Sequence, residues 1–415
     1  MTGTPGDGPA QGDLPRHPVV VIGAGAAGIL AAIFATGGDA PVLLLERTKD
    51  GGRKILISGG GRCNVLPSKL EPERFVTDSS PHTLRNMLRS WPLEEQRKFF
   101  EEEVGVPLAL EEETGKLFPV SNKARDIRDG LLTLAKARGV ELRFDTVVRD
   151  LIRADDGHWR VTLDGGQALD ASRVVLASGG LSVPATGSDG VGLRLARSLG
   201  HVMHETYPAL TPLTADPAVH AELSGVSLDV QLESVSEGRR TTTQGGFLFT
   251  HRGYSGPSVL DISHVAVRSR SAGMHAPITA CWTALDAAAW ENLLTERSAA
   301  HVITILRREL PARLAGVLLE AAAIPADRTL DQLRREERRA LIDVLTRCAL
   351  PWTGDEGYKK AEVTGGGVAL GEVNPRTFES RKHPGLYFCG EILDAFGPIG
   401  GHNFAWAWAT GRGAG

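Results

Sequence analysis

Glycines near the two ends of this 415-residue chain have the types and spacing of a nucleotide-binding site. The apolar run 19–22 leads directly into Gly23, Gly25 and Gly28, which match the pattern GxGxxG. In that pattern the first glycine permits a tight turn, the second lets the backbone approach a pyrophosphate, and the third lets the helix pack on the strand. The free N–H groups of the following helix would face the phosphates. The segment therefore predicts a dinucleotide site.

An acidic residue follows at the distance that such a site requires. Glu46 ends the next apolar run, roughly 20 residues beyond the glycines, where a carboxylate can accept hydrogen bonds from the adenosine ribose. We predict that neighbouring residues border the same ligand, namely Ala26, Ala27, Arg47, Val147 and Val148.

Two further segments favour FAD over NAD. One is a basic, glycine-rich loop that could follow a phosphate or the flavin edge, although an exposed turn is the alternative. It consists of Lys54, Ser58, Gly59, Gly60, Gly61, Arg62, Cys63 and Asn64. Cys63 is either a redox-active or a buried, inert thiol, and the lack of a nearby partner cysteine favours the inert thiol. The other is the C-terminal segment, described next. A further stretch at the end of the apolar strand 173–177 is also predicted to border the ligand and consists of Ala177, Ser178, Gly179 and Gly180.

The C-terminal segment is predicted to hold the flavin ring. A strand at 386–389 ends at Gly390 and Glu391, and Asp394 follows. Asp394 could accept a ribityl hydroxyl, or it could cap a helix. Gly400, Gly401, His402 and Asn403 then begin a helix whose N-terminus could stabilise negative charge on a reduced flavin.

Two residues are candidates for catalysis. His402 could donate a proton or hold a substrate carbonyl, and the alternative is a structural histidine bonded to the backbone. Tyr254 lies in a loop, 250–257, that opens a helix with Pro257 in its first turn. It could line a substrate pocket, or it could belong to a capped helix start and nothing more.

With these motifs in view, the chain resembles the YhiN-like (BaiN/RdsA-like) family of NAD(P)/FAD-dependent oxidoreductases, some members of which carry the label aminoacetone oxidase. The matching segments are 54–64, 115–121, 177–187, 249–260 and 363–403. The resemblance implies an α/β fold, with a Rossmann-like FAD-binding domain of glutathione-reductase type. That domain has a parallel sheet and a β-meander, and an inserted domain with a β-barrel part and a helical part interrupts it. The family usually has Tyr where this chain has His402.

Changes in composition along the chain predict the domain limits. Residues 1–17 are expected to be a disordered leader, and residues 18–205 and 356–415 the FAD-binding domain. Residues 206–355 are expected to form the insert, mainly β at 206–285 and mainly α at 286–355.

Bulk properties narrow the function classes. The net charge of -4 and the lack of a basic stripe argue against nucleic acid as a partner. No apolar run approaches the roughly 18 residues that a membrane span needs. Four scattered cysteines suggest neither a disulfide framework nor a metal site, and they favour a cytoplasmic setting.

These observations predict a flavoenzyme. Non-covalently bound FAD would pass a hydride through its N5, from NAD(P)H to a small organic acceptor. Because no second GxGxxG is found, NAD(P)H would bind only transiently. One alternative is an oxidase of a small amine such as aminoacetone that uses O2. The other is a flavin-binding regulatory protein without turnover.

Overall fold

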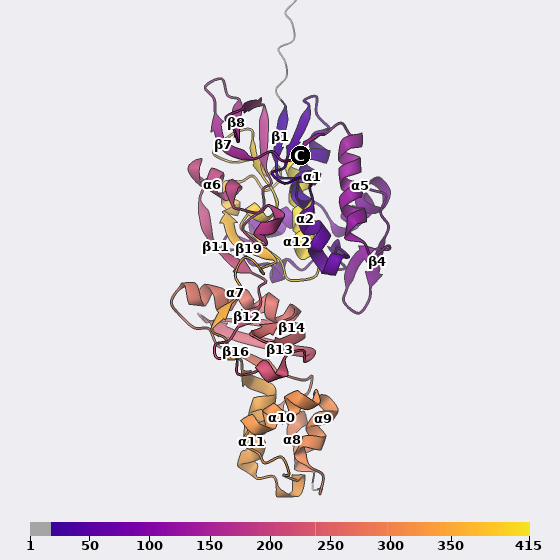
Figure 1. The fold of residues 1–415 in the computed structure, drawn as a ribbon, viewed down its shortest axis with the longest axis vertical. Helices are drawn as coiled ribbons and strands as arrows, with labels where there is room; N and C mark the ends of the chain where they lie inside the picture. Colours follow the sequence, from indigo (N-terminus) through magenta and orange to yellow (C-terminus); the bar gives the residue numbers. More distant parts are fainter. Residues whose placement is uncertain (1–17, 237, 297) are drawn as a thin grey trace, which may run out of the picture.

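The structure is a computed structural model that describes residues 18–236, 238–296 and 298–415, so the leader expected at 1–17 lies outside the described residues. The molecule is elongated, with an α/β body at one end, a β layer in the middle and a group of helices at the far end (Figure 1). The N-terminal and C-terminal parts of the chain lie together in the α/β body, where α12 (His402–Ala414) packs beside α1 (Ala26–Ala35).

A five-stranded parallel sheet forms the centre of this body, in the order β20-β10-β1-β2-β6. Every residue of β1 and β2 is buried, as expected for a parallel sheet covered on both faces, and this explains the unbroken apolar runs. The strands are β1 (Val19–Ile22), β2 (Val42–Leu45), β6 (Glu141–Arg143), β10 (Arg173–Leu176) and β20 (Leu386–Phe388).

Helices surround this sheet. α1 and α12 approach closely, since a Cβ on Gly411 of α12 would lie 2.4 Å from the carbonyl oxygen of Ala27. The other helices of the body are α2 (Arg53–Ile57), α3 (Pro81–Leu88), α4 (Leu93–Lys98), α5 (Ala124–Ala137) and α6 (Val191–Ser198).

Three small sheets complete the body. The predicted β-meander is present as β7 (Val148–Arg153), β8 (Trp159–Leu163) and β9 (Ala168–Ala171). A second sheet contains β3 (Leu66–Pro67), β5 (Lys116–Pro119) and β4 (Leu108–Glu111). In the third sheet, β11 (Met203–Ala209) pairs antiparallel with β19 (Val363–Val368). β11 and β19 carry the chain out of the body and back into it.

The middle layer is a seven-stranded sheet in the order β17-β16-β13-β14-β15-β12-β18. Its strands are β12 (Leu213–Thr214), β13 (Ser227–Ser236), β14 (Arg239–Thr250), β15 (Gly253–Ser255), β16 (Ile278–Cys281), β17 (Cys348–Ala349) and β18 (Gly354–Asp355). Helix α7 (Pro257–Ser271) packs against β14 and β13 and also against β11 of the body. A segment expected to be mainly β thus also contains a long helix.

The far end is helical, as the composition suggested, and its apolar residues share one core with the seven-stranded sheet. Its helices are α8 (Ala287–Thr295), α9 (Val302–Glu309), α10 (Ala312–Ala321) and α11 (Arg335–Arg347). A separate core fills the α/β body. The predicted fold class is therefore confirmed. Among the described residues, no helix is long and apolar enough to cross a membrane.

Candidate cofactor-binding site

A cavity of about 510 Å³ lies at the carboxyl ends of the parallel strands. Its wall includes Ile22 at the end of β1, Leu45 at the end of β2 and Ala177 just after β10. Open α/β sheets bind their ligands at this position, and the volume is in the usual range of roughly 300–1,000 Å³ for ligand sites. Residues from both ends of the chain line the cavity.

The turn between β1 and α1 gives each glycine a different surrounding. Gly23 has a φ of +107°, a backbone conformation that favours glycine. A Cβ on Gly25 would meet nothing within 4 Å, so the Gly25 backbone faces open cavity. A Cβ on Gly28 would lie 1.8 Å from the Gly23 carbonyl oxygen, so Gly28 serves close packing. The N-terminus of α1 is left accessible to an anion.

Glu46 is buried beside this turn and is held in a fixed orientation. Its Oε2 accepts from the Ala24 N–H at 2.8 Å, and its Oε1 accepts from Thr48 N–H at 2.8 Å and Thr48 Oγ1 at 2.7 Å. A carboxylate oxygen has two lone pairs, so Oε2 keeps capacity for a ligand hydroxyl. Val147 and Val148 also line the cavity. Arg47 forms an ion pair with Asp189.

The basic loop contributes α2 and a short 3-10 turn, Ser58–Gly61, in which Gly59 and Gly60 have φ of 55° and 67°. Lys54 forms an ion pair with Glu391, which also accepts from the Thr364 N–H at 2.9 Å. The ion pair links the basic loop to the C-terminal segment. Both of its residues line the cavity. The Arg62 guanidinium lies 4.0 Å from the ring centroid of Phe118.

The C-terminal segment directs a second helix N-terminus at the cavity. Gly400, Gly401 and Asn403 lie in its wall at the start of α12. Gly401 has a φ of +93°, and a Cβ there would lie 2.6 Å from the carbonyl carbon of Leu66. The Asn403 amide closes the preceding loop by accepting from the Gly397 N–H and donating to the Gly397 carbonyl, both at 2.9 Å.

The structure brings most of the predicted binding residues together. Those that line the cavity are Gly23, Gly25, Ala26, Ala27, Glu46, Arg47, Lys54, Ser58, Gly59, Gly60, Arg62, Asn64, Val147, Val148, Ala177, Ser178, Gly179, Gly390, Glu391, Gly400, Gly401 and Asn403. Those outside its wall are Gly28, Gly61, Cys63, Gly180, Asp394, His402 and Tyr254. Gly180 serves packing, because a Cβ there would lie 2.4 Å from Thr364 Oγ1.

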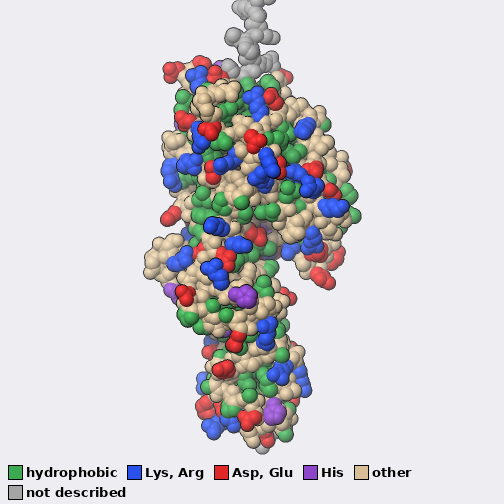
Figure 2. All heavy atoms as spheres, in the orientation of Figure 1, with side chains coloured by type: hydrophobic (Ala, Val, Ile, Leu, Met, Phe, Trp, Pro, Cys, Tyr) green, Lys and Arg blue, Asp and Glu red, His purple; other side chains and the backbone are tan. Residues whose placement is uncertain are grey.

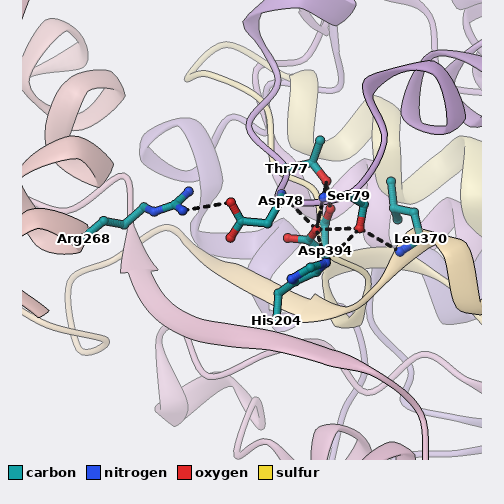
Figure 3. Close-up of polar contacts among 7 residues, drawn as sticks. All are labelled: Thr77, Asp78, Ser79, His204, Arg268, Leu370 and Asp394. Atoms are coloured by element: carbon teal, nitrogen blue, oxygen red, sulfur yellow. Dashed lines mark hydrogen bonds and ion pairs between the residues drawn. The ribbon is translucent and has the colours of Figure 1, made fainter. Parts of the chain in front are cut away.

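Asp394 is a correction to the sequence prediction, because it does not line the cavity. Its carboxylate instead faces Thr77, Ser79 and His204 (Figure 3). Its Oδ2 accepts from Thr77 Oγ1 at 2.9 Å, from Ser79 Oγ at 2.8 Å, and from the N–H groups of Asp78 and Ser79 at 3.0 and 2.9 Å. His204 Nε2 lies 3.6 Å from the same oxygen. These contacts engage one of the two carboxylate oxygens and hold the side chain at the 77–79 loop.

The same cluster contains serine, histidine and aspartate but lacks the geometry of a nucleophilic triad. Ser79 Oγ donates its proton to Asp394, while the Leu370 N–H donates to Ser79 Oγ at 2.9 Å. His204 faces both partners with one ring nitrogen, Nε2. In a triad the aspartate would orient the opposite nitrogen of the histidine. The cluster instead joins the 77–79 loop to β11 and to the C-terminal segment.

His402 is buried behind the start of α12 and does not line the cavity. Its ring packs edge-on against Phe75 with centroids 6.0 Å apart. The nearest polar groups are backbone groups of Ile399 and Lys69, and they partly offset the desolvation of the ring. Desolvation lowers the pKa of His402 to about 4, so the ring is neutral near pH 7. The predicted proton-donor role is not supported by this placement.

Tyr254 is the second correction among the catalytic candidates. It is fully buried in the core of the middle layer, where its ring lies near Phe247 and Phe249. Its hydroxyl bonds to His220 Nδ1 at 2.9 Å. Tyr254 therefore satisfies its polar group inside that core and takes no part in the cavity.

Cys63 has the environment of an inert thiol. It is fully buried, and desolvation raises the pKa of its thiol to about 12. The reactive thiolate is therefore scarce near neutral pH. Cys63 and Gly61 have φ of +61° and +88°, so both shape the backbone of the loop. Neither lines the cavity.

Sequence reasoning missed several wall residues. Lys116, Phe118, Glu362, Val363, Phe396 and Ile399 line the cavity from β5, from the start of β19 and from the loop before α12. Lys116 and Phe118 stand in the segment 115–121, and Glu362 stands directly before the segment 363–403. Their position inside or beside these motifs was a usable signal, but no spacing rule assigns them a role.

The fold and the cavity define the class, a Rossmann-type dinucleotide-binding protein with a large insert. The chain belongs to the family described as "HI0933-like protein Rossmann domain", which matches residues 17–415. The ribosomal RNA dihydrouridine synthase of Escherichia coli (strain K12) is 35% identical over 402 residues, covering 95% of this chain and 96% of that protein. The 3-dehydro-bile acid delta(4,6)-reductase of Clostridium scindens is 32% identical, covering 95% and 97%. The family expected from the motifs, one of FAD-dependent oxidoreductases, is thus confirmed.

Solved structures share the fold at low identity. The 3-ketosteroid-delta4-(5alpha)-dehydrogenase from Rhodococcus jostii RHA1 is 17% identical, with a TM-score of 0.50 and 98% of both chains covered. The 3-ketosteroid delta1-dehydrogenase from Sterolibacterium denitrificans is 14% identical, with a TM-score of 0.51, and 97% and 99% are covered. These likenesses support the assigned fold class.

Proposed function

We propose that this chain binds FAD non-covalently and reduces a carbon–carbon double bond conjugated to a carbonyl group, with NAD(P)H as the electron donor. The observation that carries the proposal is the single cavity onto which the N-termini of α1 and α12 both open, with Glu46 at one end. Bound flavin would supply two-electron hydride chemistry, and the protein would supply orientation and electrostatics.

The residues present fit such a cofactor. The turn at Gly23 and Gly25 would hold the pyrophosphate, and the free capacity of Glu46 Oε2 would accept a ribose hydroxyl. The N-terminus of α12, at Gly400 and Gly401, would stabilise negative charge on the reduced ring. Lys54 and Glu391, paired with each other, would fix the wall between these two ends.

The choice of acceptor rests on what the two relatives' names have in common. Dihydrouridine synthesis reduces a double bond of the uracil ring that is conjugated to a carbonyl. A delta(4,6)-reductase of a 3-dehydro-bile acid acts on ring double bonds conjugated to the 3-oxo group. Both names therefore describe one reaction type, and we assign that type to this chain with a small-molecule acceptor.

Uracil in ribosomal RNA is the second candidate acceptor, because relatives 35% and 29% identical are named for it. The net charge of -4 alone therefore does not exclude RNA as a substrate. Figure 2 shows Lys and Arg interspersed with Asp and Glu over one face of the molecule, which does not single out a nucleic-acid surface. We therefore keep the small molecule as the proposal and make RNA an outcome of the test.

The test is anaerobic stopped-flow spectroscopy of the flavin-loaded protein. We expect NADH or NADPH to bleach the flavin, and 2-cyclohexen-1-one or 4-androstene-3,17-dione to restore its absorbance with formation of the saturated ketone. Restoration only by unmodified ribosomal RNA, with dihydrouridine formed, would favour the second candidate. Bleaching by aminoacetone with reoxidation by O2 would favour an oxidase, and no bleaching by any donor would favour a regulatory protein.

A further inference from the structure

Glu362 is a carboxylate in the cavity wall that the proposed cofactor contacts do not use. It lies immediately before β19, and its backbone N–H donates to the Leu210 carbonyl at 3.1 Å. The side chain is solvent-accessible and lines the cavity, while Val363 beside it is buried. In the described part of the chain its carboxylate forms no hydrogen bond or ion pair within the usual distances, unlike Glu46 and Glu391.

The neighbouring wall places Glu362 beside the segment that leads into α12, the part of the cavity to which we assign the flavin ring. Phe396, Ile399 and Gly400 line this end and lead into α12. Val363 and Phe396 share a small apolar core at the junction with the insert. Lys116 also reaches this end, since its Cε lies 3.6 Å from where a Cβ on Gly400 would be.

We infer that Glu362 is the acid that protonates the substrate carbon in the reduction. In this reaction a hydride bonds to the β-carbon and a proton bonds to the α-carbon, while the π bond between them breaks. The two electrons would come from a dihydronicotinamide, and bound flavin would supply the hydride chemistry between donor and acceptor. The O–H bond of the Glu362 carboxyl breaks as the α-carbon gains its proton, and solvent then returns a proton to the carboxylate. This inference rests on the proposed function.

The electrostatic surroundings suit an acid that must hold its proton. Part of the Glu362 side chain reaches solvent through the cavity, yet enough protein surrounds its carboxyl that desolvation raises its pKa. The charge of Asp261 on α7 acts in the same direction. Lys116 on β5 and Lys54 on α2 oppose this effect more weakly. Desolvation also raises the pKa of Asp261, to about 6. Asp261 is already engaged, because it accepts from the Ile399 N–H at 2.7 Å, whereas Glu362 is free to face a substrate.

The decisive comparison is Glu362→Gln with Glu205→Gln as the matched control. Glu205 is an exposed carboxylate on β11, the strand that pairs with β19, and it does not line the cavity. In Glu362→Gln we expect bleaching by NADH or NADPH to be unchanged and reoxidation by 2-cyclohexen-1-one to slow at least about 100-fold, the usual contribution of a general acid. Glu205→Gln should match the unsubstituted protein, and Glu362→Asp should recover part of the rate.

Two further readouts separate an acid from a structural residue. Reoxidation by the unsubstituted protein should slow as pH rises through the Glu362 pKa, since the protonated form reacts, and this slope should vanish in Glu362→Gln. Infrared titration of the flavin-loaded protein should show, in addition to the band of Asp261, a carboxyl band of Glu362 that persists above the ordinary glutamic acid pKa of about 4.3. That band should be missing from Glu362→Gln and present in Glu205→Gln.

Each failure has its own signature. Equal reoxidation rates in Glu362→Gln and the unsubstituted protein, or carboxyl bands that are identical in the two proteins, would overturn the acid role alone. If the unsubstituted protein is bleached by NADPH yet no conjugated acceptor reoxidises it, the proposed function falls, and the acid role falls with it.

Discussion

Gly25 and Gly28 stand in one turn, yet the structure assigns them different tasks. Gly25 has a φ of -81°, which any residue can adopt, and a Cβ there would point into open space. Gly28 has no such room, since its Cβ would meet the Gly23 carbonyl oxygen. One position is therefore free for the ligand, and the other is required by the fold.

This difference predicts opposite outcomes for two substitutions. Gly25→Val should leave the melting temperature of the flavin-free protein almost unchanged and weaken FAD binding at least about tenfold, or about 1.4 kcal/mol, because the side chain would occupy ligand space. Gly28→Ala should lower the free energy of unfolding by about 1–3 kcal/mol or more through overpacking. Thermal melts and FAD titrations of both variants check this, and a stable Gly28→Ala protein would contradict it.

His402 predicts a pH dependence of stability. Its pKa in the folded protein is lowered from the ordinary value of 6.5 to about 4 by desolvation. A lowered histidine pKa means that the stabilisation is complete above pH 6.5 and is lost as pH falls towards 4. At about 1.36 kcal/mol for each pKa unit, the loss is at most about 3 kcal/mol.

Urea unfolding between pH 7 and pH 4 tests this prediction. The free energy of unfolding should fall less steeply in His402→Gln than in the unsubstituted protein. Half-buried His264, whose pKa desolvation also lowers to about 4, should account for part of the slope that remains. Parallel slopes in the two proteins would mean that His402 titrates as an ordinary histidine.

At the scale of elements, Asp394 acts as a clamp between segments. It binds the 77–79 loop, and that loop's Asp78 forms an ion pair with Arg268 of α7 at 2.8 Å. The Cζ of the same Arg268 guanidinium lies 5.3 Å from the ring centroid of Tyr207 on β11. The clamp thus joins the α/β body to the first helix of the insert, outside the cavity.

Removing the clamp should therefore cost stability and not a direct flavin contact. Asp394→Asn replaces an oxygen acceptor with an amide that cannot satisfy every donor, so we expect a loss of about 1–3 kcal/mol. The melting temperature should fall by similar amounts with and without FAD. A loss seen only in the FAD-bound protein would restore Asp394 as a cofactor ligand.

Local patterns were enough to predict the elements that hold the proposed nucleotide. The buried runs of β1 and β2, the glycine turn and Glu46 all obey short-range rules of period and spacing. Asp394 could not be placed this way, because its partners Thr77 and Ser79 lie more than 300 residues away in sequence. The prediction for Tyr254 was wrong for a similar reason. The core that encloses its side chain is formed by residues distant in sequence, which come together only in the tertiary structure.

Across the whole molecule, the first and last segments of the chain together line the cavity at the carboxyl ends of the parallel strands. α1 and α12 pack together, and Lys54 pairs with Glu391, so the two segments form one unit of the body. The insert contacts that unit through α7, where the Asp261 carboxylate accepts a hydrogen bond from the N–H of Ile399 in the cavity wall. The division of the chain at residues 206 and 355 remains our proposal, supported by the separate core of the sheet and helical end.

If both segments bind one flavin, equilibrium titration of flavin-free protein with FAD should show it. We expect one FAD per chain, released intact on denaturation, with affinity lowered in both Gly25→Val at the first segment and Gly400→Val at the last. Failure to bind FAD, or affinity indifferent to either substitution, would contradict it.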